Sequence, residues 1–480
     1  MFKKISFLFL NHNPKQTVIK NSFWLVFGQT IGRLIRAGLL IFAARLLGSA
    51  SWGAFSYALS VAAFLSIFSD LGINAFITRE LSRQKEKAFK LISAGLYLKI
   101  TVVIFLASII PPLSKFLTNI EEAKSLISLA VLIFAFDTIR DFAFAINRAS
   151  EKMEIESLVN IFTNITITVF GLTFLFIYSS SSALILGYAL GSLLGSIAMV
   201  FFIKKHLFYF FSKISFQNIK EVLRLSLPFS VMAIMGAVMI NTDIIIIGWF
   251  KDAIETGLYS AAQKPIQLLY LLPASLAASV FPSLSKFATE NKESFKKIFE
   301  QSLVFSILIA LPISLGSFIN SKAIILLLYG QEYFLSYPSF AILSLTLFII
   351  FPSIIIGNGI FALNEQKKLI AFSLLGIFGN LILDLILIPK IGIIGCAWAT
   401  LINQVVINSY LLYKIKKITN FSLFSYLKKI AIASFLMAVF SFSLNYLNIN
   451  IIINITSSTL LYLSLLFLLK EKMIFSLIKK

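Results

Sequence analysis

The sequence predicts an all-α integral membrane protein with about 14 transmembrane helices, and three observations lead to that fold class. Hydrophobic residues make up 58% of the 480 residues and charged residues only 13%, whereas soluble domains hold roughly 45–50% and about 25%. The apolar residues form runs of about 20, the length of helix that crosses a hydrocarbon core about 30 Å thick. In lipid, a backbone within such a run satisfies its own hydrogen bonds only as a helix, which excludes open sheets.

The apolar runs give fourteen expected spans, and a count of twelve or thirteen stays open. In chain order they are 20–46, 53–78, 91–114, 125–147, 157–178, 182–203, 223–250, 257–284, 301–320, 337–363, 369–388, 392–413, 430–446 and 450–469. No connecting loop is long enough to fold alone, because the longest are under about 20 residues.

These spans predict two six-helix lobes of the same orientation, followed by two extra C-terminal helices. Residues 53–56 (GAFS) and 257–260 (GLYS) each open a span and lie 204 residues apart, as in transporters built from a parallel repeat. The expected segments are an N-terminal tail (1–19), an N-lobe (20–205), a linker (206–222), a C-lobe (223–415), spans 13 and 14 (427–469) and a C-terminal tail (470–480).

The basic residues predict the orientation, because cytosolic loops of membrane proteins are rich in Lys and Arg. With a cytosolic N-terminus, cytosolic segments hold 31 of the 42 basic residues, outer loops hold 5 and spans hold 6. Both tails and the linker are then cytosolic, and the expected location is the inner (cytoplasmic) membrane. The net charge of +21 is therefore an orientation signal beside an anionic leaflet, and we expect no nucleic-acid partner.

Few residues could carry catalytic or metal chemistry. The chain has one cysteine, Cys396, and two histidines, His12 and His206, which both fall in expected cytosolic segments. It contains no HExxH, no P-loop and no Ser/His/Asp set. We therefore expect no enzymatic activity, no cofactor and no metal site.

Ionisable residues inside spans are costly, so they are the first candidates for function. Gln29, Arg33 and Arg36 share one helical face of the first span, at spacing i, i+4, i+7. The same spacing recurs in the eighth span at Ser260, Lys264 and Gln267.

Together these residues predict a water-filled cavity between the two halves that attracts anions. Its expected cations are Arg33, Arg36, Lys99, Arg140 and Lys264, and its expected polar residues are Gln29, Asn160, Asn164, Ser260 and Gln267. Arginine suits phosphate, because its planar fork donates two parallel hydrogen bonds. For Arg140 the alternative is a structural ion pair with Asp137 or Asp141, and for Asn160 and Asn164 it is simple bonding between helices.

An ordered set of short motifs resembles the MOP (multidrug/oligosaccharidyl-lipid/polysaccharide) exporter superfamily, specifically its polysaccharide-type, Wzx-like flippases. The motifs are ARLLG (44–48), WG (52–53), SDLG (69–72), Asp243 with Gly248, GLYSAA (257–262), FP (281–282), NL (380–381), LIP (387–389) and GIIG (392–395).

The resemblance implies a MATE/MOP-type fold that flips a polyprenyl-diphosphate-linked oligosaccharide, such as an O-antigen or capsule unit, from the inner to the outer leaflet. It also implies cavity cations on spans 1 and 8, where this chain has Arg33, Arg36 and Lys264. Without a nucleotide site, the drive is an ion gradient, the membrane potential or removal of product, and Asp70 and Asp137 are candidates for ion coupling. The expected partners are the bilayer and glycan assembly machinery (polymerase, glycosyltransferases), and we expect a monomer.

Three alternatives stay open on the sequence. A lipid II flippase is close to the main interpretation. A MATE-type multidrug/cation antiporter would favour an acidic cavity, but span 1 carries two arginines and no acid. A membrane polymerase or ligase of lipid-linked sugars is the least favoured, because it would need a long outer loop with catalytic groups.

Overall fold

The computed structural model describes residues 11, 13–83, 85–204 and 215–471, and every regular element among them is helical. The predicted all-α class is therefore confirmed for the described part of the chain. His12 and His206 lie outside the described residues. So do most of both predicted tails and part of the predicted 206–222 linker.

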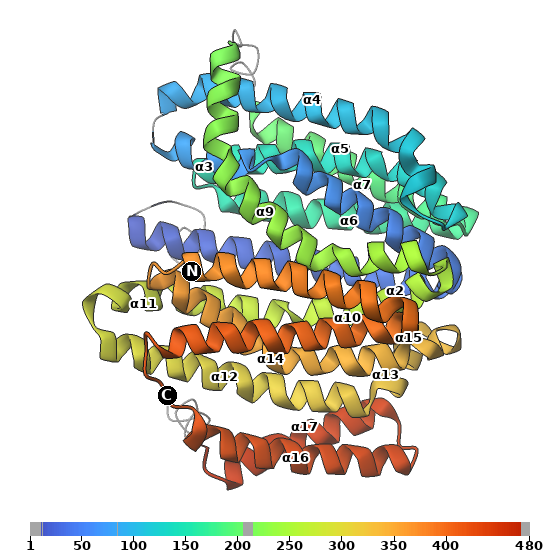
Figure 1. The fold of residues 1–480 in the computed structure, drawn as a ribbon, viewed down its shortest axis with the longest axis vertical. Coiled ribbons are helices and arrows are strands. Elements are labelled where there is room, and N and C mark those ends of the chain that lie inside the picture. The colour runs from blue at the N-terminus through green and yellow to red at the C-terminus, as the bar shows by residue number, and fades with distance from the viewer. Residues whose placement is uncertain (1–10, 12, 84, 205–214, 472–480) are drawn as a thin grey trace, which may run out of the picture. The chain divides into compact units, whose positions relative to one another are not determined.

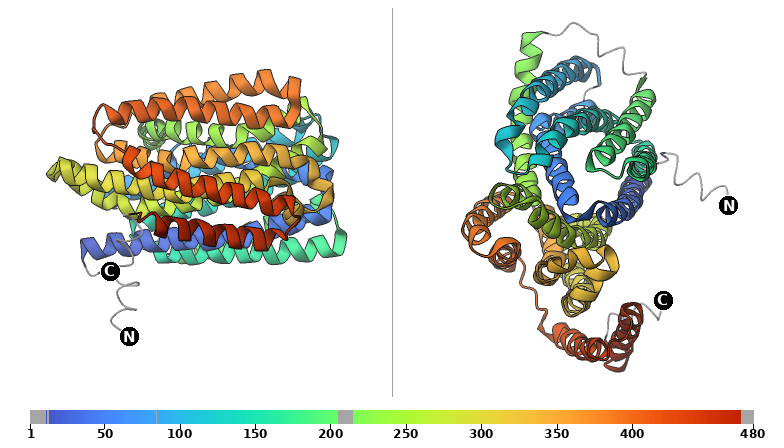
Figure 2. Two further views of the ribbon diagram at one scale, coloured as in Figure 1. Left: turned by 90° about the horizontal axis from the view of Figure 1, so that it is seen from below. Right: turned by 90° about the vertical axis from the view of Figure 1, so that its right-hand side faces the viewer.

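The chain divides into two compact units, and the first extends from Met1 to Gly257 (Figures 1 and 2). Its long helices run side by side. They are α2 (Pro14–Asp70), α3 (Ile73–Arg83), α4 (Lys85–Leu117), α5 (Glu121–Ala149), α6 (Met153–Tyr178), α7 (Ser181–Phe202), α9 (Phe216–Phe250) and the first turn of α10 (Ala253–Leu269).

The second unit extends from Leu258 to Lys480. It contains the rest of α10, then α11 (Leu271–Glu290), α12 (Lys292–Ile319), α13 (Ser321–Tyr329), the 3₁₀ helix η2 (Gln331–Ser336), α14 (Tyr337–Ala362), α15 (Lys367–Lys416), α16 (Phe424–Tyr446) and α17 (Ile451–Leu468).

Helix α9, which the sequence assigned to the C-lobe, packs within the first unit against α2, α3 and α4. Its C-terminal end is held by the turn between α4 and α5. The Thr118 hydroxyl donates to the Gly248 carbonyl at 3.1 Å, and Trp249 Nε1 donates to the Leu117 carbonyl at 2.6 Å. The division into units accordingly falls inside α10, after Gly257.

Two of the long helices are bent: α15 contains two of the predicted spans, and α2 contains the span 20–46 and most of the span 53–78, which ends in α3. In α2 the bend is at Gly48, whose φ of 74° lies in the region that glycine adopts without strain. In α15 it is at Ile391 and Gly392, and Gly392 has φ 59°. Both bends lie at the loops that the sequence expected between neighbouring spans.

The predicted eighth span, 257–284, contains Pro265, Pro273 and Pro282 and is broken in the structure. The break is at Tyr270, between α10 and α11, and Pro273 follows it in the first turn of α11. Pro273 has no N–H, so it cannot bond to the carbonyl one turn earlier. Pro265 does not break the helix, because α10 continues through it to Leu269.

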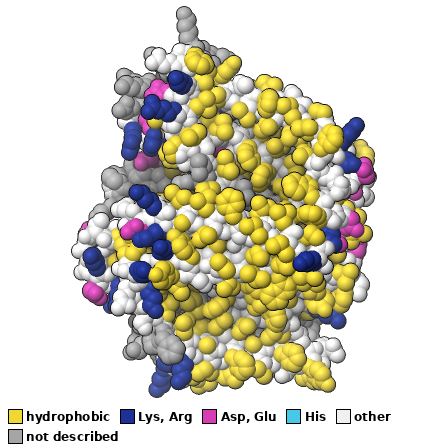
Figure 3. Space-filling view, viewed as in Figure 1, with side chains coloured by type: hydrophobic (Ala, Val, Ile, Leu, Met, Phe, Trp, Pro, Cys, Tyr) yellow, Lys and Arg dark blue, Asp and Glu magenta, His cyan; other side chains and the backbone are white. Residues whose placement is uncertain are grey.

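Ten helical segments of the described part are long and apolar enough to cross a membrane, by length and composition alone. Two of them, Gln16–Asp70 and Lys367–Lys416, are the bent helices. On the face that Figure 3 shows, hydrophobic side chains cover the middle of the helices in each unit, and Lys and Arg gather toward the helix ends. Large apolar side chains such as Phe176 and Phe435 are exposed, as expected for surfaces that face lipid.

The first glycines of the two predicted repeat motifs, Gly53 and Gly257, lie in a close backbone contact within the first unit. A Cβ on Gly53 would overlap the carbonyl oxygen of Ala253. In the same way, a Cβ on Gly257 would overlap that of Ser49. Ser49 and Ala253 are themselves 204 residues apart, which is the offset of the repeat. The contact is therefore reciprocal, and it brings the backbone of α2 against the first turn of α10, within the first unit.

Small residues also bring α6 close to both of its neighbours. On α7, Gly187 and Gly191 lie against the backbone of α6 at Phe170 and Ile167, and Gly195 lies against the Thr163 side chain. On α2, Gly28 contacts Ser157, and Gly32 contacts Asn164. Close approach at small residues is the usual packing device of membrane helices. Here it sets the arginine-bearing face of α2 beside the asparagines of α6.

In the second unit, α16 is tied to α12 and α17 by a buried hydrogen-bond network as well as by apolar contacts. Asn320 Nδ2 donates to the Ser441 hydroxyl at 2.8 Å, and that hydroxyl donates to Asn454 Oδ1 at 2.8 Å. Asn454 Nδ2 in turn lies 3.2 Å from Asn320 Oδ1. Because these side chains satisfy one another, their burial among apolar helices carries no large desolvation cost.

Candidate functional site: a cationic cavity in the first unit

A cavity of about 320 Å³ lies among helices of the first unit. Its volume is in the range of small-molecule sites. It is lined by Gln29, Arg33 and Arg36 of α2, Asn74 of α3, Arg140, Asp141, Phe144 and Arg148 of α5, and Glu156, Asn160 and Asn164 of α6.

The face of α2 that the sequence singled out does open on one cavity. Gln29, Arg33 and Arg36 all line it, as the i, i+4, i+7 spacing predicted. Asn160 and Asn164, the polar residues expected from α6, line the same cavity. The structure therefore brings together five of the predicted site residues from two helices.

Arg36 is held in place by α6 and α7. Its Nε donates to Asn164 Oδ1 at 2.7 Å, and its guanidinium carbon lies 5.4 Å from the centre of the Tyr188 ring. Asn164 is itself fixed by a 2.7 Å bond from Nδ2 to the Asn160 carbonyl. These amides both line the cavity and bond between helices, so the two interpretations of them are compatible.

Arg33 differs from Arg36 in having no such partner. Within the described part of the chain its guanidinium makes no hydrogen bond or ion pair, and its side chain is exposed. All five of its N–H donors are therefore available to a ligand in the cavity.

Arg140 is both a cavity residue and a member of an ion pair. Its Nη1 lies 2.7 Å from Asp137 Oδ1, and its Nη2 lies 3.3 Å from Asp141 Oδ1. The structural ion pair expected from the sequence is therefore present. Asp137 is engaged by this pair and is not among the residues that line the cavity.

Lys99 and Asp70, predicted as a cavity cation and a coupling acid, bind each other. Lys99 Nζ lies 2.8 Å from Asp70 Oδ1, and the Lys99 side chain is only 3% exposed. Neither residue lines the cavity. Their spacing of 29 residues along the chain gave no signal of this pairing.

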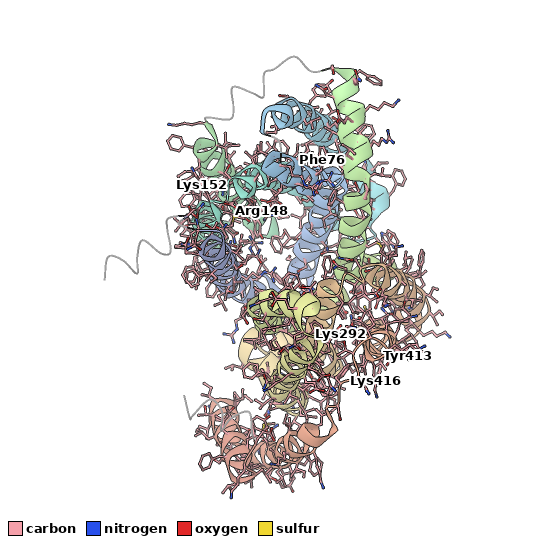
Figure 4. All side chains as sticks on the ribbon, turned by 90° about the vertical axis from the view of Figure 1, so that its left-hand side faces the viewer. Phe76, Arg148, Lys152, Lys292, Tyr413 and Lys416 are labelled. Atoms are coloured by element: carbon pink, nitrogen blue, oxygen red, sulfur yellow. The ribbon has the colours of Figure 1, made fainter. Side chains whose placement is uncertain are left out.

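Arg148 and Glu156 line the cavity but were missed by sequence reasoning, which placed Arg148 in a cytosolic loop. Arg148 Nε donates to Glu156 Oε2 at 2.8 Å, and its Nη2 donates to Oε1 at 2.5 Å. Figure 4 shows Arg148 and Lys152 at the end of the first unit where α5 turns into α6. The sequence held one signal of this pair: Arg148 and Glu156 have opposite charges and lie on either side of the short turn between α5 and α6.

Lys264, Ser260 and Gln267 all lie on α10 within the second unit. Ser260 is buried, and Lys264 and Gln267 are half-buried. Their expected role in the same cavity as Arg33 stays a prediction.

The cavity is suited to an anion. Its lining carries four arginines against two acids, Asp141 and Glu156. Both carboxylates already contact an arginine, so they are poor candidates for ligands of a metal ion. The amide side chains of Gln29, Asn74, Asn160 and Asn164 add groups that can both donate and accept hydrogen bonds, as sugar hydroxyls require.

The fold and this cavity define the chain as a multi-pass, all-helical membrane protein with a net-positive internal site. The chain belongs to the polysaccharide biosynthesis protein family, whose sequence profile matches residues 18–288. The resemblance to polysaccharide-type members of the MOP exporter superfamily is thereby confirmed.

Several relatives match over most of the chain, and three of them carry names that concern glycans. A Shigella flexneri protein named as an O-antigen transporter is 24% identical over 79% of this chain and 93% of its own length. The capsular polysaccharide biosynthesis protein CapF of Staphylococcus aureus is 24% identical over 83% of this chain and 99% of its own length. A Haloferax volcanii protein named as the low-salt glycan biosynthesis flippase Agl15 is 24% identical over 78% of this chain and 79% of its own length.

Solved structures share the fold. The lipid II flippase MurJ, in an inward closed conformation, superposes with a TM-score of 0.78 at 21% identity, over 95% of this chain and 100% of that one. A MOP superfamily transporter from Pyrococcus furiosus gives a TM-score of 0.60 at 14% identity, over 87% and 98%. At these identities the likeness concerns the fold alone.

Proposed function

We propose that this protein is a flippase that moves a polyprenyl-diphosphate-linked oligosaccharide, such as an O-antigen or capsule repeat unit, from the inner to the outer leaflet. The observation that carries the proposal is a cavity with four arginines in a chain of apolar helices, with the Arg33 guanidinium free of acceptors among the residues that the structure describes. Membership in the polysaccharide biosynthesis family and the names of the relatives support it.

In this proposal the diphosphate binds to Arg33 and Arg36, and Arg140 and Lys264 add positive charge. The amides of Asn160 and Asn164 face the hydrated part of the substrate, and the polyprenyl tail stays in lipid. Two six-helix lobes rock around the site in alternating access, and two further helices complete fourteen spans. The protein acts as a monomer, without enzymatic activity or a cofactor, alongside the glycosyltransferases and polymerase of glycan assembly.

A specific observation also favours one alternative function. The fold superposes on that of MurJ, which is named as a lipid II flippase. A lipid II flippase would use the same diphosphate chemistry and differ in the glycan. A cation antiporter is less suited to this cavity, whose lining has an excess of positive charge.

Reconstitution tests the proposal. We expect purified protein in liposomes to move a fluorescent polyprenyl-diphosphate oligosaccharide between leaflets, measured by its accessibility to an added glycan-binding lectin. We expect no movement of the corresponding polyprenyl monophosphate at a comparable rate, because one phosphate engages fewer of the arginines. Equal rates for liposomes with and without protein would contradict the proposal, and movement of lipid II alone would favour the alternative.

The proposed topology places both termini in the cytosol of a cell with this protein in its inner membrane. Reporter fusions after residues 120 and 420 are expected to show an outer and a cytosolic location, respectively, because the basic loops lie on the cytosolic side. At each site we compare the activity of an alkaline phosphatase fusion, which reports an outer location, with the fluorescence of a fusion that reports a cytosolic location. The opposite pattern at both sites would overturn the orientation.

A further inference from the structure

The cavity proposed to bind a diphosphate also contains a carboxylate that is weakly paired and accessible. Asp141 lines the cavity, and its side chain is 47% exposed. Within the described residues its carboxylate contacts one cation, Arg140, at 3.3 Å, and Arg140 is closer to Asp137, at 2.7 Å. Asp141 therefore shares an arginine whose charge another acid already balances.

The other acids near this cavity are more firmly engaged. Asp70 is bound to the buried Lys99 at 2.8 Å. Glu156, with a side chain only 6% exposed, accepts two hydrogen bonds from Arg148. Asp137 is 25% exposed and holds the shorter contact to Arg140. Of these four acids, Asp141 is the one with both access to the cavity and an incomplete set of partners.

An anion in this cavity would change the proton affinity of Asp141. The helices around it carry, among their charged and titratable groups, Arg33, Arg36 and Asp70 on α2, Arg79 and Glu80 on α3, Lys99 on α4, Asp137, Arg140 and Arg148 on α5, Glu156 on α6 and Tyr188 on α7. A diphosphate would add two negative charges and draw the arginines toward itself. Repulsion by a nearby like charge favours the neutral form of a carboxyl group.

We propose that Asp141 is the carboxyl group that takes up a proton when the diphosphate binds, so that substrate binding and protonation are linked. This inference rests on the proposed function of the cavity. A hydronium ion of the solvent gives its proton to the Asp141 carboxylate, so that one O–H bond of hydronium breaks, the O–H bond of the carboxyl group forms, and a water molecule is left. The Asp141 proton removes a repulsive charge, and Arg140 Nη2 becomes available to the phosphates while Nη1 stays with Asp137. By linkage, the affinity for the diphosphate is highest where Asp141 is protonated and falls as the pH rises.

The test measures binding of a short-chain polyprenyl diphospho-N-acetylglucosamine to the full-length protein in nanodiscs between about pH 5.5 and 8.5. This diester is chosen because its phosphates stay ionised throughout, so the pH dependence belongs to the protein. We expect the affinity of the wild-type protein for the ligand to fall by up to about tenfold per pH unit, over the pH range in which Asp141 is ionised in the free protein and protonated in the complex. We also expect uptake of up to one proton per ligand, measured with an indicator dye in weak buffer.

The matched variants are Asp141→Asn and Asp137→Asn, which remove neighbouring carboxylates that contact the same arginine. Asp141→Asn is expected to lose the pH dependence and the proton uptake, whereas Asp137→Asn is expected to retain both. This inference alone would be overturned if the affinity of Asp141→Asn for the ligand still depended on pH, or if the wild-type protein bound the ligand without taking up a proton. Absence of binding by the wild-type protein at every pH would overturn the proposed function and this inference with it. Should Asp141→Asn not fold, the wild-type proton uptake still decides the question.

Discussion

Replacement of Arg33 by alanine is expected to reduce flipping of the lipid-linked diphosphate by about 10- to 150-fold, because a hydrogen bond to a charged group contributes about 1.5–3 kcal/mol. The reason lies in the local geometry. Arg36 and Arg140 are bound to protein acceptors, but the Arg33 guanidinium is exposed without one among the described residues. Its loss removes donors and charge without leaving a buried partner unsatisfied. The measurement is the initial flipping rate in proteoliposomes with equal amounts of protein.

Two controls make this result specific. Arg33→Lys keeps the charge but loses the bidentate fork, so we expect an intermediate rate. Arg83→Ala removes an exposed arginine at the end of α3, away from the cavity lining, and should leave the rate unchanged. A wild-type rate for Arg33→Ala would remove Arg33 from the proposed site. The same assay on Lys264→Ala tests whether the cation of α10 belongs to that site.

Introduction of a methyl group at the helix crossing, as Gly53→Ala or Gly257→Ala, is expected to destabilise the protein by about 1–3 kcal/mol or more. At each position the new Cβ would overlap a backbone carbonyl of the facing helix, and a backbone atom cannot move aside as a flexible side chain can. The measurement is the thermal unfolding midpoint in detergent, where both variants should melt below the wild-type protein.

Gly38 provides the matched control for this crossing. It lies on the same helix α2, and a Cβ added there would meet no atom within 4 Å. Gly38→Ala is therefore expected to be neutral or to stabilise by about 0.5–1 kcal/mol, since alanine favours the helix. If Gly53→Ala melted at the same temperature as Gly38→Ala, the close contact between α2 and the first turn of α10 would be contradicted.

Much of the fold was predictable because membrane insertion depends on local composition. Each of the fourteen predicted apolar runs falls on helix in the described part, although two pairs of runs share the bent helices α2 and α15. The segment from 321 to 336, which forms α13 and η2, was not predicted as helical. It is too short to give the 20-residue signal on which the other predictions depended.

Part of the site was also predictable, because helical periodicity places Gln29, Arg33 and Arg36 on one face. Which charges would pair was predictable only where the partners were neighbours in the chain, as for Arg140 and Asp137. Lys99 illustrates the limit. Its depth in a span made it a cavity cation from the sequence, yet in the structure it is buried against Asp70.

The sequence by itself determined the membrane class, the helical runs, the expected orientation and the arginine-bearing face of α2. Those properties follow from hydropathy, charge counts and the 3.6-residue period, which act over a few helical turns. Only the tertiary structure decided which arginines are engaged and which is available. Arg36 meets Asn164 across 128 residues of chain, and Lys99 meets Asp70 on another helix. Such pairings depend on how the helices pack, for example on the contacts that Gly28 and Gly32 of α2 make with α6. No local sequence pattern encodes them.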